Sequence, residues 1–315
     1  MSSHTERGPS MPARRRRVTP DRLAEMKAAG EPIAMVTAYD FPSAQVVEEA
    51  GVDVVLVGDS AAMTVLGHDS TVPVGMTEML VLAAAVRRGL RTPLLVGDLP
   101  FGSYERSDEL AVDNAQRFVK EAGCDAVKLE RGGTSVDRAR AIVRAGIPVM
   151  GHVGLTPQTA TQLGGFKAQG RSAARAAEIA TEALALQEAG CFALVFEAMP
   201  AAVTEMLMPL LSVPVIGIGA GQATDGQVLV FHDLLGIYAG HTAKFVKRYA
   251  DVRTEMLRGV AAYVGDVRTH AFPGPEHVYA IDPAELAELR RLLDRRAVLP
   301  WARAAGEAVR QPYPS

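Results

Sequence analysis

Three acidic residues each end a short apolar run. Asp59 ends DVVLVGD, Asp98 ends PLLVGD and Glu130 ends DAVKLE. Apolar runs of this length without polar alternation predict strands that are buried on both faces. A carboxylate is a costly residue at the end of such a strand. Because the three runs follow one another along the chain, we expect neighbouring strands whose carboxylates converge on one spot.

Lys128 is the one cation inside these runs. Side chains two residues apart on a strand face the same way, so Lys128 and Glu130 are expected to point inward together, with Val127 and Leu129 facing outward. An unpaired buried ammonium is very costly, so Lys128 requires the carboxylates as partners.

The cluster of Asp59, Asp98 and Glu130 predicts a metal site. Repulsion among three carboxylates in a pocket is weakly screened, so positive charge beyond Lys128 is needed. The ligands are all oxygen, which favours Mg²⁺ over Zn²⁺. The alternative is that Asp59 or Asp98 only caps the following helix; their occurrence on consecutive strands favours the metal.

Two further strand ends carry residues able to move protons. Glu197 ends FALVFE, and a carboxyl in apolar surroundings can act as a general acid or base near neutrality. A hydrogen bond from Glu197 to loop backbone is an equally good interpretation. His152 ends IPVMGH and could bind or orient a substrate carboxylate, although a lone histidine is more often structural.

A repeated rhythm of strand, helix and glycine organises the chain. Helix ends such as VVEEAG (46–51) and LQEAG (186–190) lead at once into apolar strands, as in parallel sheets. Eight such units over about 250 residues predict an α/β protein with a (β/α)₈ TIM barrel, and no GxGxxG follows the first strand to support a Rossmann fold. The expected strands are 33–37, 53–58, 93–98, 125–130, 147–152, 192–197, 214–218 and 235–239. The expected helices are 20–29, 41–50, 77–89, 107–122, 134–145, 172–189, 200–211 and 225–231.

The barrel is expected over residues 18–265, with helix 20–29 plugging its bottom. Residues 1–17 contain the run Arg14–Arg17 and predict a disordered tail rather than a nucleic-acid patch. Residues 242–265 should form one or two helices. The C-terminal extension, 266–315, should contain one helix that opens at Asp282.

Two segments at the exits of the predicted strands are longer than usual. Residues 59–76 and 152–171 are rich in Gly, Thr and Ser, and long loops at this face are often functional lids. After the seventh strand, Gly217–Gly221 could bind phosphate through backbone N–H groups or form a closely packed turn.

The composition is that of a soluble globular protein with ample core. Apolar residues make up 48% and charged residues 22% of the 315 residues, and the net charge is −3. These values give no reason to expect nucleic acid or a membrane as a partner. The chain shows no apolar stretch long enough to span a bilayer and no signal peptide. Cys124 and Cys191 lack metal or redox spacing and predict reduced core thiols in a cytoplasmic protein.

Six motifs in order resemble the ketopantoate hydroxymethyltransferase family. They are VGDSAAMTVLGHDST (57–71), GDLPFGSY (97–104), KLE (128–130), GHVGLTPQ (151–158), GGFKAQGR (164–171) and IGIGAGQATDGQVLV (216–230). The resemblance runs from about Val18 to Asp251.

This resemblance implies a barrel of the phosphoenolpyruvate/pyruvate type, assembled as a homodecamer of two pentameric rings. It implies transfer of a hydroxymethyl group from 5,10-methylenetetrahydrofolate to 3-methyl-2-oxobutanoate, giving ketopantoate for pantothenate and coenzyme A biosynthesis. Asp59, Asp98 and Glu130 would hold Mg²⁺, with Glu130 expected to bind through water because negative charge exceeds positive charge at the site.

The same resemblance gives the remaining roles. Asp59, Ser60, Asp98, Lys128 and His152 would bind the keto acid, and Glu197 would be the catalytic acid or base.

The chain departs from the family at Arg131, which separates Glu130 from the glycine pair. Arg131 could shift the loop or meet the folate. Two alternatives to the hydroxymethyltransferase are a C–C lyase of the isocitrate lyase type, which needs a loop cysteine, and a non-catalytic barrel that binds a keto acid.

Overall fold

A computed structural model describes residues 16–131, 133–240 and 242–296. The chain divides into two compact units, one ending at Arg253 and the other beginning at Thr254. The predicted barrel extended to residue 265, so the unit boundary lies earlier in the sequence. Most of the predicted N-terminal tail, and residues 297–315 of the extension, lie outside the described residues. Arg17 is described, and its guanidinium pairs with Asp125.

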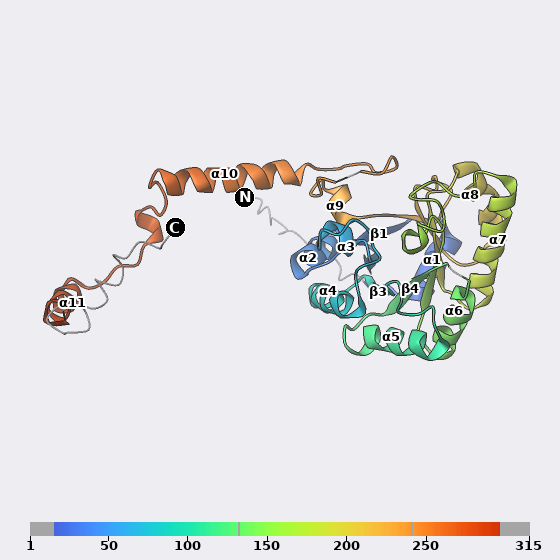
Figure 1. Ribbon diagram of the computed structural model, residues 1–315, viewed down its shortest axis with the longest axis horizontal. Coiled ribbons are helices and arrows are strands. Elements are labelled where there is room, and N and C mark those ends of the chain that lie inside the picture. Colours follow the sequence, from blue (N-terminus) through green and yellow to red (C-terminus); the bar gives the residue numbers. More distant parts are fainter. Residues whose placement is uncertain (1–15, 132, 241, 297–315) are drawn as a thin grey trace, which may run out of the picture. The chain divides into compact units, whose positions relative to one another are not determined.

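The first unit is a closed barrel of eight parallel strands in sequential order, surrounded by helices (Figure 1). This confirms the predicted (β/α)₈ architecture. The strands are β1 (Ile33–Thr37), β2 (Val54–Val57), β3 (Leu94–Asp98), β4 (Ala126–Glu130), β5 (Val149–Gly154), β6 (Ala193–Glu197), β7 (Val215–Ile218) and β8 (Gly226–Leu229). The helices of this unit are α1 (Pro20–Ala29), α2 (Phe41–Ala50), α3 (Ala61–Thr64), α4 (Met76–Gly89), α5 (Asp108–Lys120), α6 (Ser135–Arg144), α7 (Ala173–Glu188), α8 (Ala201–Leu207) and α9 (Phe231–Leu234), with 3₁₀ turns η1 (Pro157–Thr159) and η2 (Met208–Leu210).

The eighth strand was predicted wrongly. It is Gly226–Leu229, inside the segment predicted as a helix (225–231), whereas 235–239 follow the short helix α9 and belong to no strand. β8 is only half covered, with buried Gly226 and Val228 alternating with exposed Gln227. The strand was instead predicted in the run LLGIYA (234–239), because that run is more continuously apolar.

Two apolar cores result from the alternation of side chains along the strands. One lies inside the barrel, and the other lies between the strands and the helices. In β4, Ala126 belongs to the inner core while Val127 and Leu129 belong to the outer one, as predicted.

Helix α1 closes the end of the barrel where the strands begin. Its N-cap is Thr19, whose hydroxyl accepts a hydrogen bond from the Arg22 backbone at 3.3 Å. Leu23 and Met26 of α1 belong to the inner core of the barrel. The predicted plug is therefore confirmed.

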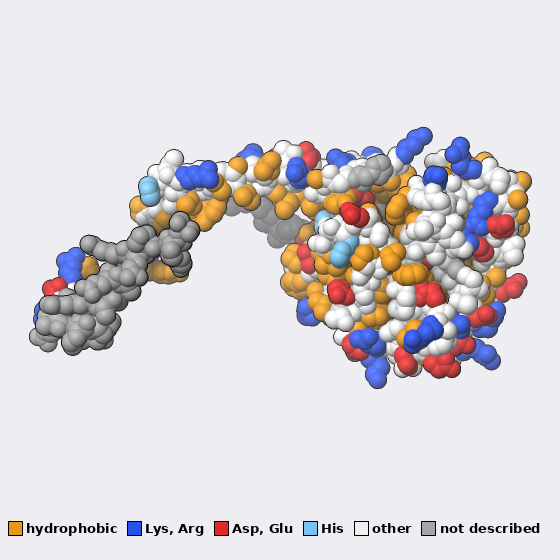
Figure 2. All heavy atoms as spheres, in the orientation of Figure 1, with side chains coloured by type: hydrophobic (Ala, Val, Ile, Leu, Met, Phe, Trp, Pro, Cys, Tyr) orange, Lys and Arg blue, Asp and Glu red, His pale blue; other side chains and the backbone are white. Residues whose placement is uncertain are grey.

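The second unit contains α10 (Val252–Arg268), η3 (Pro275–His277) and α11 (Pro283–Arg296), with α10 starting just before the boundary. The helical segment predicted over 242–265 is thus helical only from Val252. No residue of α10 is buried, and Figure 2 shows hydrophobic side chains along it. As predicted, α11 opens at Asp282, whose side chain accepts a hydrogen bond from the Ala284 N–H at 2.8 Å. Among the described residues, no helix has the length and apolar character needed to cross a membrane.

Candidate active site

A cavity of about 730 Å³ lies at the ends of the strands, opposite α1. Asp59, Asp98, Glu130, His152 and Glu197 all line it. Each lies in or just after a different strand from β2 to β6, so the barrel brings together side chains that are far apart in sequence. His152 was predicted to end its strand, but β5 continues to Gly154. Both long loops, 59–76 and 152–171, contribute to its wall.

The three predicted carboxylates converge here. Asp59 is 5% exposed, while Asp98 and Glu130 are each 1% exposed. The Asp59 backbone N–H donates to Asp98 Oδ2 at 3.1 Å. Lys128 Nζ lies 2.9 Å from Asp98 Oδ1 and 3.8 Å from Glu130 Oε1. Lys128 and Glu130 thus point into the barrel together, as the spacing predicted.

Burial and crowding perturb these acids unequally. Burial, then repulsion from Asp98 and Glu130, raises the pKa of Asp59 well above its ordinary value. Burial also raises the pKa of Asp98, although Lys128 opposes the rise. Burial alone would raise the pKa of Glu130 too, but hydrogen bonding with His152 and the charge of Lys128 outweigh it, so that pKa falls. Added positive charge near Asp59 and Asp98 would therefore stabilise their ionised carboxylates.

His152 joins the cluster to Glu197. Its Nδ1 lies 3.4 Å from Lys128 Nζ and 3.5 Å from Glu130 Oε1, and its Nε2 lies 3.3 Å from Glu197 Oε2. Burial and Lys128 lower the pKa of His152, but Glu130 and Glu197 raise it more, to about 9. The raised pKa favours the charged form of His152, whose ring lies between two carboxylates.

Ser60 immediately precedes the short helix α3 and lines the cavity. It does not cap α3 and instead shares a 2.8 Å hydrogen bond with the Tyr39 hydroxyl. Tyr39 is fully buried, and burial raises its pKa to about 12. The phenol thus stays protonated, and its hydrogen bond fixes the position of the Ser60 hydroxyl.

The donor chemistry of the cluster fits a hard divalent cation. Asp59, Asp98 and Glu130 offer only oxygen ligands, and the buried acids raise one another's pKa values. In the part of the chain that the structure describes, however, no three His, Cys, Asp or Glu side chains form a ready-made ligand group. The ammonium of Lys128 lies against Asp98 and supplies part of the positive charge that a metal ion would otherwise provide.

Gln158 and Tyr104 are buried polar residues of this site that sequence reasoning missed. Gln158 contacts both Asp59 and Glu130, and its side-chain oxygen accepts a hydrogen bond from the Tyr104 hydroxyl at 2.7 Å. Both residues lie in the quoted motifs GHVGLTPQ and GDLPFGSY. The only sign of their role in the sequence was that each is a polar residue inside a long motif. Neither lies on a strand, so alternation could not predict where its side chain points.

The cavity extends beyond the acids to a second group of side chains. This part is lined by aromatic residues and by two exposed lysines from the loops after β5 and α9: Phe166, Lys167, Tyr238, Lys244 and Phe245. The compartment therefore combines ring surfaces with positive charge near its mouth.

The glycine-rich segment after β7 has a packing explanation. A Cβ on Gly219, whose φ is +64°, would lie 2.4 Å from the Phe245 ring, and a Cβ on Gly221 would lie 2.6 Å from that of Ala201. Of the two interpretations of this segment, the closely packed turn is the one with contacts to support it.

Arg131 does not line the cavity. Its backbone N–H donates to the His152 carbonyl at 3.0 Å, which continues the pairing of β4 with β5. Its Nε lies 2.9 Å from Glu182 Oε2 on α7. The additional arginine is thus accommodated between the barrel and its helices.

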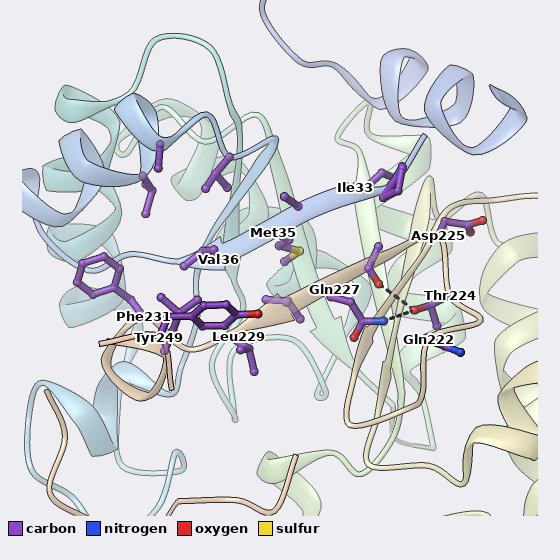
Figure 3. Close-up of a pocket in the computed structure, with 18 of the residues that line it drawn as sticks. Ile33, Met35, Val36, Gln222, Thr224, Asp225, Gln227, Leu229, Phe231 and Tyr249 are labelled. Carbon is purple, nitrogen blue, oxygen red and sulfur yellow. Dashed lines mark hydrogen bonds between the residues drawn. The ribbon is translucent and has the colours of Figure 1, made fainter. Parts of the chain in front are cut away.

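A separate apolar groove of about 850 Å³ lies outside the barrel, along β1 and β8 (Figure 3). Figure 3 shows Val36, Leu229 and Phe231 beside Tyr249, while Gln227 and Thr224 hydrogen-bond at 2.8 Å at the other end. The groove contains none of the acids described above.

Comparison with known proteins identifies relatives along most of the chain. Residues 17–275 match the model of the family described as Ketopantoate hydroxymethyltransferase. A 3-methyl-2-oxobutanoate hydroxymethyltransferase of Moorella thermoacetica is 54% identical over 267 residues, covering 85% of this chain and 99% of the relative. The mitochondrial 3-methyl-2-oxobutanoate hydroxymethyltransferase 1 of Arabidopsis thaliana is 50% identical over 296 residues, covering 90% of this chain and 85% of the relative.

A solved structure supports the type of barrel. That of 2,3-dimethylmalate lyase, described as a member of the PEP mutase/isocitrate lyase superfamily, aligns with a TM-score of 0.50. It is 14% identical, and the match covers 93% of this chain and 98% of that chain. The likeness shows the fold alone.

Proposed function

Since the chain belongs to the ketopantoate hydroxymethyltransferase family, we propose that this enzyme joins the one-carbon unit of 5,10-methylenetetrahydrofolate to C3 of 3-methyl-2-oxobutanoate. Water supplies the hydroxyl, and the products are ketopantoate and tetrahydrofolate. The observation that carries this proposal is the convergence of Asp59, Asp98 and Glu130 with Lys128 in one buried cavity. Such a site can hold a small anionic keto acid only if cations offset the acids.

Mg²⁺ is the proposed cation, with Asp59 and Asp98 as direct ligands and Glu130 acting through water. The absence of a ready-made group of three ligands among the described residues is compatible with this arrangement. A bound Mg²⁺ would supply Lewis acidity that polarises the keto oxygen and makes the C3 proton easier to remove.

The residues of the chain supply the remaining steps. Ser60, Lys128 and His152 are proposed to bind and orient the keto acid, because all three line the cavity beside the acids. Glu197 is proposed to take the C3 proton and later return it to the folate nitrogen that leaves as tetrahydrofolate. It lies at the edge of the cluster, where its Oε2 is 3.3 Å from His152 Nε2.

The second compartment is proposed to hold the folate. A cavity of about 730 Å³ has the size of sites for drug-sized ligands, far larger than the keto acid needs. Phe166 and Phe245 offer surfaces for a pterin ring, and Lys167 and Lys244 offer charge for the glutamate carboxylates.

Self-association as a decamer is also proposed. The groove along β1 and β8 leaves apolar surface uncovered, and Met256, Val260, Tyr263 and Val267 repeat along one exposed face of α10. Light scattering on the full chain should give the mass of a decamer, and Val260→Glu should lower that mass. A monomer at micromolar concentration would contradict the proposal.

The cytoplasmic location also stays a prediction, because the Arabidopsis relative is named as mitochondrial.

A single-turnover assay tests the function. Protein, keto acid, methylenetetrahydrofolate and Mg²⁺ should yield ketopantoate, and without folate solvent deuterium should enter C3 of the keto acid. Neither reaction should survive EDTA. Turnover in EDTA would contradict the metal, and absence of exchange would favour the non-catalytic binding barrel.

The lyase alternative lacks its cysteine among the described residues. Cys124 and Cys191 are both buried, and burial raises the pKa of each to about 12. Neither lines the cavity.

A further inference from the structure

The geometry points to Gln158 as a positioning residue that aligns Asp59 and Glu130 and couples the loop after β5 to cation binding. The inference deepens the proposed function and rests on it, since it concerns the cation of that same site.

Gln158 makes hydrogen bonds to two of the three acids and to the segment that follows β3. Its backbone N–H donates to Glu130 Oε2 at 3.0 Å. Its Nε2 donates to Asp59 Oδ2 at 3.0 Å and to the Leu99 carbonyl at 3.0 Å. Its Oε1 accepts from the Tyr104 hydroxyl at 2.7 Å. Both amide N–H groups and the amide oxygen are therefore used, which fixes the orientation of the side chain.

This arrangement selects one oxygen of each acid. Asp59 Oδ2 accepts from the Gln158 side chain and Glu130 Oε2 accepts from the Gln158 backbone N–H. Asp59 Oδ1 therefore remains to face a cation, while Glu130 Oε1 lies 3.5 Å from His152 Nδ1. An asparagine is one methylene too short to make the same contacts, and an apolar side chain would leave a buried carboxylate oxygen without its donor. Groups that orient metal ligands in this way typically change metal affinity by about 10–100-fold when mutated.

The coupling to the loop follows from where Gln158 lies. It sits in the single turn η1 (Pro157–Thr159), and eight residues further on Phe166 begins the part of this loop that lines the second compartment. The far end of the loop is anchored by the Gln169 N–H, which donates to the Ala198 carbonyl at 2.9 Å. A cation that fixes the acids stabilises the turn, and by reciprocity an ordered turn favours the cation.

The test uses Gln158→Met, which keeps the length of the side chain and removes its amide. Calorimetric titration of the EDTA-treated full chain with Mg²⁺ should show binding weakened about 10–100-fold relative to wild type. The matched control is Gln162→Met, an exposed glutamine of the same loop, and its affinity should equal that of wild type.

Limited proteolysis provides a second readout. Mg²⁺ should slow trypsin cleavage after Lys167, an exposed residue of this loop, in wild type and in Gln162→Met but not in Gln158→Met. A residue that only supported the fold would lower the unfolding temperature without abolishing this effect of Mg²⁺.

The outcomes separate the inference from the function. Wild-type affinity and protection in a folded Gln158→Met would overturn the inference alone. If wild type itself bound no Mg²⁺, both the proposed metal and the inference would fail. If Gln158→Met did not fold, Tyr104→Phe would decide, because it keeps the ring and removes the donor to Gln158 Oε1, together with the Tyr104 contacts to the Glu130 backbone. A several-fold loss of affinity with loss of the Mg²⁺ protection at Lys167 supports the inference, and unchanged affinity overturns it.

Discussion

Replacing Asp98 by asparagine should destabilise the protein by a predictable amount. Asp98 presents Oδ1 to Lys128 Nζ at 2.9 Å and accepts the Asp59 N–H on Oδ2 at 3.1 Å. An asparagine has one oxygen for these two donors, so its NH₂ group must face either the ammonium or the backbone N–H. The variant therefore loses the charge that offsets a buried lysine and places two donors against each other.

The magnitude follows from what remains around Lys128. Removing one partner of a buried ion pair costs about 3–5 kcal/mol. The lower end applies because Glu130 still lies 3.8 Å from Nζ and because the substitution removes the repulsion between Asp98 and Asp59. For a domain of this size about 3 kcal/mol corresponds to a fall of roughly 6–12 °C in the unfolding temperature. Because native proteins are stable by about 5–15 kcal/mol, the variant should still fold at 25 °C.

Calorimetry and urea titration of the metal-free full chain measure this loss. Asp113→Asn is the control, since Asp113 is exposed on α5 and should change stability by less than about 0.5 kcal/mol. A folded Asp98→Asn as stable as wild type would refute the reasoning that Lys128 depends on Asp98. The variant should also show no exchange at C3 of the keto acid.

Three further predictions concern other parts of the molecule. Glu197→Gln should slow deuterium exchange at C3 by about 10²–10⁴-fold with little change in unfolding temperature, because the shape is kept and the proton acceptor is lost. The thiols of Cys124 and Cys191, with pKa values raised to about 12 by burial, should not react with a disulfide reagent at pH 8 until the chain is unfolded. Gly97→Ala should destabilise the barrel by about 1–3 kcal/mol in urea titration, since a Cβ there would lie 2.4 Å from the Phe118 ring.

Each of these three predictions can be contradicted by a specific result, and two of them have a matched control variant. Glu205→Gln, on the exposed side of α8, should leave exchange unchanged, and equal rates for the Glu197 variant would remove it from the proposed chemistry. One rapidly reacting thiol in the native protein would contradict its burial. Gly133→Ala meets no atom within 4 Å and should be neutral, so an equally neutral Gly97→Ala would show that the ring of Phe118 can move away.

The first seven strands could be predicted because each is a short apolar run that helices cover. β8 could not, since Gly226 and Gln227 give it a weak apolar pattern and a short helix follows at once. Gly226 is required for a different reason: a Cβ there would lie 2.3 Å from the Ile33 carbonyl oxygen. Close approach of two backbones is a property of the closed barrel and has no signature in local periodicity.

The candidate site divides in the same way. Asp59, Asp98 and Glu130 were predictable because strand ends in a barrel meet at one rim, and alternation fixed the direction of Lys128. Gln158 was not, because it lies in a loop whose path depends on the contacts it makes. The orientation of a loop side chain is set by tertiary contacts, so local sequence does not predict it.

The plug formed by α1 makes the barrel a dead end. With Leu23 and Met26 filling the base, reactants must come and go through the mouth at the opposite rim. The acids lie deep and the lysine-bearing compartment lies near the entrance, so a folate seated there would block the way in. If folate binds there as proposed, the keto acid would have to arrive first, and the spent folate would have to leave before the larger product could escape.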